Sequence, residues 1–150
     1  MTKLYPLTLK LINKKVLVVG AGKVALRKLQ GLVGTGAEIT VVSPEVLPEI
    51  EVLPDITIIQ RHFQPSDTKN AHIIYAATDN QQVNDEVGRY IEHWQWFDNT
   101  ALPEASNFFT PAVIREKGLI VSISTEARDP TRAKLIKQKI TDFLLKSMKE

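Results

Sequence analysis

The sequence predicts an α/β fold in which a mostly parallel sheet is followed by a short antiparallel hairpin and a C-terminal helix. Three observations support this prediction. An apolar strand, a glycine turn and an amphipathic helix follow one another directly over residues 15–34. Further apolar runs alternate with helical or loop segments up to residue 93, as parallel strands joined by crossovers require. Beyond residue 110, two short apolar runs are joined around Gly118, which is typical of a hairpin.

The elements of the parallel part follow from the spacing of apolar residues. Strands are expected at 15–19, 37–42, 56–60 and 72–77, and helices at 23–34 and 80–93. The first helix runs into Gly34-Thr35-Gly36, which suits a helix C-cap. Residues 43–55 carry three prolines and are expected to form a loop with a short helical turn.

The C-terminal part is expected to hold an antiparallel pair at 111–115 and 119–124, then a helix from about Pro130. The apolar residues of that helix recur on one face, and its basic residues lie mostly on the other. These patterns divide the chain into residues 1–110 and residues 111–150.

Composition limits the chain to one well-buried domain with a short appendage. It has 150 residues, 43% of them hydrophobic, and 19 Lys and Arg against 17 Asp and Glu, so global charge gives no case for nucleic acid. The absence of cysteine excludes disulfides, thiolate metal sites and a cysteine nucleophile. We find neither a secretory apolar core nor an apolar run that could span a bilayer, and we expect a cytoplasmic protein without a membrane partner.

The glycine turn after the first strand carries the main functional signal. Gly20, Gly22 and Ala25 fit the pattern G-x-G-x-x-G/A, in which the second glycine lets a pyrophosphate approach the backbone and the third small residue lets helix and strand pack closely. The N–H groups that begin the helix would face the phosphates. Residues 1–110 are therefore expected to form a Rossmann-like dinucleotide-binding domain. The alternative is a glycine turn in an α/β domain without a nucleotide.

Thr78 and Asp79 mark a second part of the predicted site. They follow the apolar run 73–77 and precede the helix expected at 80–93. This order places them at the carboxyl edge of the sheet, where open α/β sheets bind ligands.

Several short sequence motifs, in order along the chain, are similar to motifs of one known family. They are Tyr5-Pro6-Leu7, the run 18–28, the run 40–45, Ala76-Ala77-Thr78-Asp79 with Val83-Asn84, the run 108–113, Ile123-Ser124-Thr125 and Pro130. The chain resembles the precorrin-2 dehydrogenase family, the dehydrogenase module of siroheme biosynthesis, some members of which are also sirohydrochlorin ferrochelatases.

This resemblance implies NAD-dependent oxidation of precorrin-2, or a related reduced tetrapyrrole, to sirohydrochlorin by a homodimer. It implies that residues 111–150 help to build the dimer interface and the substrate cleft. The cofactor-binding residues carried over are Gly20, Gly22, Lys23 and Val24 at the pyrophosphate, Ser43, Pro44 and Glu45 at the adenosine ribose, and Ala77, Thr78 and Asp79 on the nicotinamide side. The preference for NAD over NADP rests mainly on the family, because the second strand ends without an acidic residue and Glu45 is the nearest carboxylate.

The chain departs from the family at the catalytic aspartate. Aligning Pro103, Phe108 and Pro111 without a gap puts Ala101 at that position and Asp98 where the family usually has asparagine. Asp98 is our candidate for the general base; Glu104 could substitute, or the group could be missing.

A second departure lies in the loop before the last helix. The family's Ser-Thr-Gly-Gly-x-Ser-Pro appears as residues 124–130 without its glycines, and Ser124, Thr125 and Arg128 are the candidates for binding substrate carboxylates. His62, His72 and His93 lack metal-ligand spacing, so we expect no metal site and no ferrochelatase activity.

Two other functions remain open. One is a protein that binds NAD or a tetrapyrrole without catalysis, and the other is a partner subunit that completes a larger siroheme enzyme. Formation of NADH with precorrin-2 separates the dehydrogenase from the first of these.

Overall fold

The computed structural model describes residues 3–126 and 128–147. They form two compact units, one of residues 7–108 and one of residues 3–6 with the described part of 109–150.

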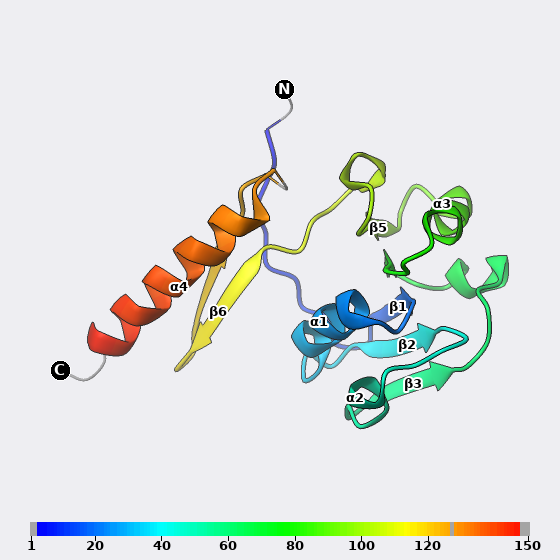
Figure 1. The fold of residues 1–150 in the computed structure, drawn as a ribbon, viewed down its shortest axis with the longest axis horizontal. Helices are drawn as coiled ribbons and strands as arrows, with labels where there is room; N and C mark the ends of the chain where they lie inside the picture. Colours follow the sequence, from blue (N-terminus) through cyan, green and yellow to red (C-terminus); the bar gives the residue numbers. More distant parts are fainter. Residues whose placement is uncertain (1–2, 127, 148–150) are drawn as a thin grey trace. The chain divides into compact units, whose positions relative to one another are not determined.

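The unit of residues 7–108 is a five-stranded parallel sheet with the strand order β3-β2-β1-β4-β5 (Figure 1). Its elements are β1 Lys15–Val19, α1 Lys23–Leu32, β2 Glu38–Val42, α2 Pro48–Glu51, β3 Ile56–Ile59, η1 Pro65–Thr68, β4 Ile73–Ala76, α3 Gln81–Arg89, β5 Trp96–Asn99 and η2 Pro103–Ala105. The strand order reverses direction between β1 and β4, which makes the crevice at their carboxyl ends the switch point of the sheet.

Helices cover both faces of this sheet. Val16 and Val18 of β1 pack with α1 and α2 on one face, and Leu17 and Val19 pack with α3 on the other. Successive side chains of a strand point to opposite faces, so a strand buried on both faces must be apolar throughout. This explains why β1 and β4 are continuous apolar runs.

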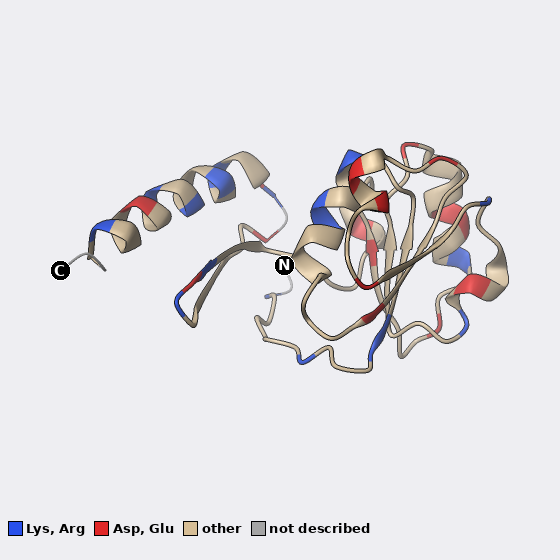
Figure 2. Cartoon of the chain, turned by 90° about the horizontal axis from the view of Figure 1, so that it is seen from below, with Lys and Arg blue, Asp and Glu red and all other residues tan. Residues whose placement is uncertain are grey.

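The second unit contains the hairpin of β6 Ala112–Glu116 and β7 Leu119–Ile123, and the helix α4 Pro130–Ser147. Lys117 and Gly118 both have positive φ, 42° and 82°, as the tight turn of a hairpin requires. The Asp129 carboxylate accepts a hydrogen bond from the backbone N–H of Arg132 and so caps α4, with Pro130 as its first residue. Lys and Arg residues recur along α4 (Figure 2).

The predicted fold class is confirmed, with two differences in its elements. The helix expected at 80–93 ends at Arg89, and β5 was not among the predicted strands. The buried Gln95 side chain explains the shorter helix: it accepts from the backbone N–H of Glu92 and donates to the carbonyl of Ala71, both at 2.8 Å. These bonds hold the segment before β5 in an irregular conformation.

Within the described residues, no helix combines the length and the apolar character that crossing a membrane requires.

Candidate functional site

The turn between β1 and α1 brings two strand ends into close contact. Gly20 has φ +105°, and a Cβ on it would lie 2.5 Å from the carbonyl oxygen of Ala77. The backbone N–H of Ala77 donates to the carbonyl of Val19 at 2.8 Å. Both the conformation and the space at position 20 therefore require glycine. The turn sits at the switch point between β1 and β4.

The start of α1 is open to a ligand. Gly22 is the N-cap residue, and no atom lies within 4 Å of where its Cβ would be. Within the described residues no side chain caps this end of the helix, and its first turn has no acidic residue. Lys23 is exposed and Val24 half-buried, while Ala25 is fully buried against the sheet. Uncapped N–H groups and the positive end of the helix dipole attract phosphate, so this turn fits a dinucleotide.

The loop after β2 is tied to the same turn. The hydroxyl of the buried Ser43 donates to the carbonyl of Glu45 at 2.7 Å, and Gln60 donates to the carbonyl of Pro44 at 3.2 Å. The backbone N–H of Leu47 donates to the carbonyl of Ala21, inside the glycine turn. Pro44 and Glu45 remain exposed beside it. The loop thus presents Glu45 at the carboxyl edge of β2.

The segment after β4 is held by one buried amide. The Oδ1 atom of Asn84, a fully buried residue, accepts from the Thr78 hydroxyl at 2.7 Å and from its backbone N–H at 3.1 Å, while Nδ2 donates to the carbonyl of Thr78. Asn80 caps α3 by accepting from the N–H groups of Gln82 and Val83. These bonds fix Thr78 and leave Asp79 exposed. Asn84 is not among the predicted site residues, although it lies in one of the motifs shared with the family.

Asp98, the candidate base, lies on β5 opposite Tyr75 of β4 and is 5% exposed. Its Oδ2 atom is 2.8 Å from the Nζ atom of Lys28 on α1, and that ammonium lies 5.2 Å from the centroid of the Tyr75 ring. The carboxylate thus faces the same side of the sheet as α1. Lys28 was not among the predicted site residues, because the two partners are 70 positions apart in the sequence.

The turn after β5 carries the position of the family aspartate. Ala101 and Glu104 are both exposed there. The buried Asn99 organises the turn: its Oδ1 atom accepts from the N–H groups of Ala101 and Leu102, and its own N–H donates to the Ser106 hydroxyl. Among the described residues, the buried Nδ2 atom of Asn99 has no hydrogen-bond partner.

The three candidate substrate residues lie together in the loop between β7 and α4. The Ser124 hydroxyl accepts from the N–H of Glu126, and the carbonyl of Thr125 accepts from the N–H of Arg128. The Thr125 hydroxyl donates to the carbonyl of Asp129 at 2.8 Å. Arg128 is exposed, with its guanidinium 3.6 Å from the Glu126 carboxylate. This loop belongs to the second unit.

The three histidines have different environments. His72 accepts a hydrogen bond from the N–H of Lys15, and its ring lies in a T-shaped arrangement with that of Trp94, whereas His62 and His93 are exposed. Within residues 3–126 and 128–147, no group of three His, Cys, Asp or Glu side chains could hold a metal ion.

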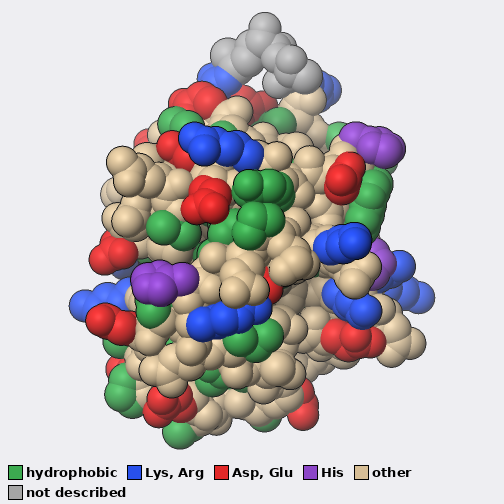
Figure 3. Space-filling view, turned by 90° about the vertical axis from the view of Figure 1, so that its right-hand side faces the viewer, with side chains coloured by type: hydrophobic (Ala, Val, Ile, Leu, Met, Phe, Trp, Pro, Cys, Tyr) green, Lys and Arg blue, Asp and Glu red, His purple; other side chains and the backbone are tan. Residues whose placement is uncertain are grey.

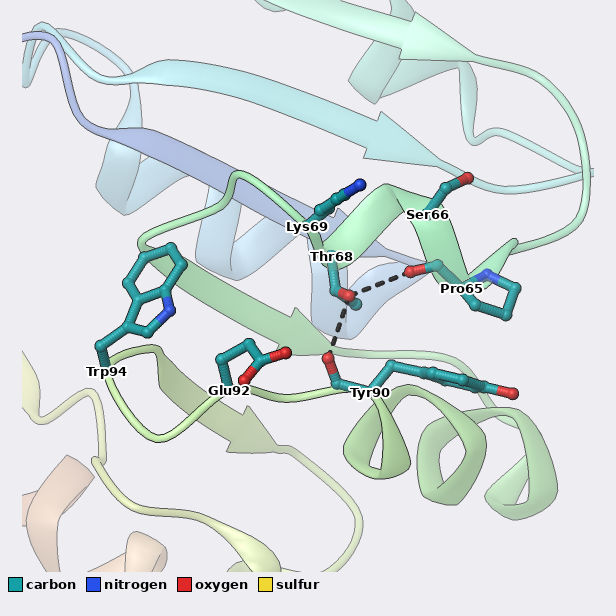
Figure 4. Close-up of a pocket in the computed structure, with 7 residues that line it drawn as sticks. All are labelled: Pro65, Ser66, Thr68, Lys69, Tyr90, Glu92 and Trp94. Carbon is teal, nitrogen blue, oxygen red and sulfur yellow. Dashed lines mark hydrogen bonds between the residues drawn. The ribbon is translucent and has the colours of Figure 1, made fainter.

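A pocket of about 520 Å³ lies away from all predicted site residues (Figure 4). Its walls come from η1, the end of α3 and the segment before β5, with Lys69, Tyr90 and Trp94 among the lining residues. In the space-filling view of Figure 3, acidic, basic and apolar side chains are mixed over the visible face, and no single type dominates it.

Comparisons with known proteins agree with this geometry. Residues 7–112 match a family described as "Putative NAD(P)-binding". Precorrin-2 dehydrogenase of Bacillus subtilis (strain 168) is 34% identical over 142 residues, which cover 93% of this chain and 88% of that protein. Siroheme synthase 3 of Aeromonas hydrophila subsp. hydrophila is 35% identical over 143 residues, which cover 93% of this chain and 31% of that longer protein. The solved structure of "SirC, precorrin-2 dehydrogenase" matches with a TM-score of 0.83 and 32% identity, over 93% of this chain and 70% of that one.

Proposed function

The chain belongs to the precorrin-2 dehydrogenase family, and from this premise we propose that it oxidises precorrin-2 to sirohydrochlorin with NAD in siroheme biosynthesis. The observation that carries the proposal is the open glycine turn at the switch point. Gly20 closes against Ala77, while the space beside Gly22 and the start of α1 stay clear. The close contact at Gly20 is needed by the fold itself, whereas the clear space at Gly22 and the uncapped helix start suit a pyrophosphate.

The chain's own residues would hold the cofactor at three strand ends. Gly20, Gly22, Lys23 and Val24 bind the pyrophosphate through the backbone and the Lys23 ammonium. Ser43, Pro44 and Glu45 line the adenosine ribose, and Ala77, Thr78 and Asp79 line the nicotinamide side. Bound NAD supplies the acceptor for the hydride.

The oxidation also removes a proton from the tetrapyrrole, and we assign that proton to Asp98. Its Oδ2 atom is engaged by Lys28, so Oδ1 is the oxygen that accepts the proton and later releases it to solvent. Glu104, exposed in η2, is the competing candidate. Loss of the base by substitution is expected to lower kcat by about 10²–10⁴.

We assign substrate binding and the contact with a second subunit to the unit that contains β6, β7 and α4. Ser124, Thr125 and Arg128 form the loop that binds the carboxylates of precorrin-2: the exposed Arg128 guanidinium and the Ser124 hydroxyl can donate to them, while the Thr125 hydroxyl donates to the Asp129 carbonyl and holds the loop. Large apolar side chains of β7 and α4 are exposed, and we propose that they form the interface of a cytoplasmic homodimer.

A charge placed in the open space beside Gly22 tests the cofactor site. Gly22 has φ −94°, which any residue adopts, so Gly22→Asp preserves the fold and adds a good N-cap to α1. The new carboxylate would repel the pyrophosphate. We expect isothermal titration to show at least about a tenfold weaker Kd for NAD, with thermal stability equal to or above that of the parent.

Gly31→Glu is the matched control, because Gly31 is also on α1, is exposed and has no atom within 4 Å of its Cβ position. It adds the same charge away from the turn and should leave the Kd for NAD unchanged. Equal NAD affinity in the parent and Gly22→Asp would contradict the assignment of this turn to the pyrophosphate.

A further inference from the structure

The ion pair between Lys28 and Asp98 joins two parts of the proposed site. Lys28 lies on α1, the helix whose start faces the pyrophosphate, and Asp98 lies on β5, the strand beyond β4. The 2.8 Å contact therefore reaches across β4, over the ring of Tyr75. Phe108 packs on the same Tyr75 ring and on Trp96, at centroid distances of 5.4 and 6.4 Å.

Burial makes each partner of this pair depend on the other. The Asp98 side chain is 7% exposed and that of Lys28 is 20% exposed. A charge buried to this extent is costly without its counterion, and removing one partner leaves the other uncompensated. The contact with the ammonium therefore fixes the orientation of the Asp98 carboxylate.

We infer that Lys28 is a positioning residue for Asp98: it holds the Oδ2 atom so that Oδ1 accepts the proton that leaves precorrin-2 with the hydride. The inference rests on the proposed function. It follows the general arrangement of catalytic bases, in which a third group orients the base. Because Lys28 belongs to α1, the same contact links the helix that binds the pyrophosphate to the strand that carries the base.

A double-mutant cycle in steady-state kinetics tests this inference. Lys28→Met is expected to lower kcat about tenfold or more while the Kd for NAD changes by less than about twofold, because α1 keeps its open end. Lys28→Arg keeps a cation near Asp98 and should recover most of kcat. In an Asp98→Asn background, Lys28→Met should change kcat by less than about twofold, because Lys28 acts only through the carboxylate.

Arg27→Met is the matched control, since Arg27 is the neighbouring cation on α1 and is exposed. It should retain the kcat of the parent. The inference is overturned if Lys28→Met retains the kcat of the parent, as Arg27→Met should. It is also overturned if Lys28→Met lowers kcat by the same factor in the parent and in the Asp98→Asn background, because Lys28 then does not act through the base.

NMR of ¹⁵N-labelled lysine side chains, recorded without ligand, keeps the two proposals separable. A slowly exchanging ammonium resonance is expected in the parent, absent from Lys28→Arg and lost in Asp98→Asn. If the resonance is present but the parent forms no NADH, the proposed function fails and the positioning role of Lys28 fails with it. If the parent turns over and no such resonance exists, the positioning role alone is overturned.

Discussion

At the scale of single residues, the two glycines of the turn differ in whether another residue could replace them. Gly20 needs both its positive φ and its missing Cβ, because the carbonyl of Ala77 occupies that space. Gly22 needs neither, since its φ is ordinary and its surroundings are empty. The first glycine is thus required by the fold, and the second leaves room for a ligand.

Glu126 is a residue in a backbone conformation that favours glycine. It has φ +55° in the loop where the family has Gly-Gly. A residue with a Cβ loses about 1–2 kcal/mol of folded-state stability in this conformation. Glycine avoids that loss, but its greater backbone freedom in the unfolded state lowers the free energy of unfolding by about 0.5–1 kcal/mol. We expect Glu126→Gly to raise the free energy of unfolding by about 0.5–1 kcal/mol in denaturant titrations.

Glu126→Ala is the control for this prediction, because it removes the same carboxylate and keeps the Cβ. It should show no gain. A Gly variant that is no more stable than the Ala variant would show that the loop does not hold this conformation in solution.

The sequence predicts those parts of the candidate site whose residues lie close together along the chain. The glycine turn and the residues after β4 lie within short runs whose chemistry is local, so their placement at strand ends followed from the pattern. Lys28 and Asn84 are absent from the predicted site, because no local pattern reveals their contacts with Asp98 and Thr78. Lys28 meets its partner only after β1, β4 and β5 have assembled.

At the scale of elements, the short helix η1 is held by a charged contact that depends on pH. The Nη1 and Nη2 atoms of Arg61 donate to the Asp67 carboxylate at 2.8 and 2.7 Å, and the backbone N–H of Gln64 donates to it at 2.8 Å. The hydrogen bonds from Arg61 hold the pKa of Asp67 below its usual value, against the opposing effect of burial.

Because the folded-state pKa of Asp67 is the lower one, its contribution to stability is complete above the unfolded-state value and is lost as the pH falls through the folded-state value. Asp67→Asn should therefore lower Tm at pH 7, and its difference from the parent should shrink below about pH 4. Thermal unfolding from pH 7 to pH 3 measures this, with the exposed Glu49→Gln as control. A difference that stays constant over that range would exclude the pair as its source.

The elements themselves were predicted unevenly. β1, α1 and the hairpin of β6 and β7 have clear periods and turn residues, and they lie where the pattern places them. β5 escaped prediction because Trp96–Asn99 has only two apolar residues, and its place in the sheet comes from pairing with β4. The end of α3 escaped for a related reason, since the buried Gln95 that redirects the chain reads as an ordinary surface residue.

At the scale of the whole molecule, exposed apolar side chains predict self-association. Leu135, Phe143 and Leu145 of α4 are 56%, 67% and 46% exposed, and Leu119 and Ile120 of β7 are 44% and 50% exposed. We expect a dimer in sedimentation equilibrium at micromolar concentration, and Phe143→Glu should weaken it by at least about tenfold in Kd.

Val52→Glu is the control, since Val52 is 81% exposed in the other unit and its replacement adds the same charge. It should leave the dimer intact. A parent chain that is monomeric at these concentrations would refute the proposed interface.

The most direct test is to follow NADH at 340 nm and sirohydrochlorin together, anaerobically, with the purified chain, NAD and enzymatically generated precorrin-2. We predict that both products form at equal rates, and that Asp98→Asn slows both by about 10²–10⁴ while Glu104→Gln stays close to the parent. If the chain binds NAD but forms neither product, it is not a dehydrogenase by itself, and a binding or partner-dependent function replaces the proposal.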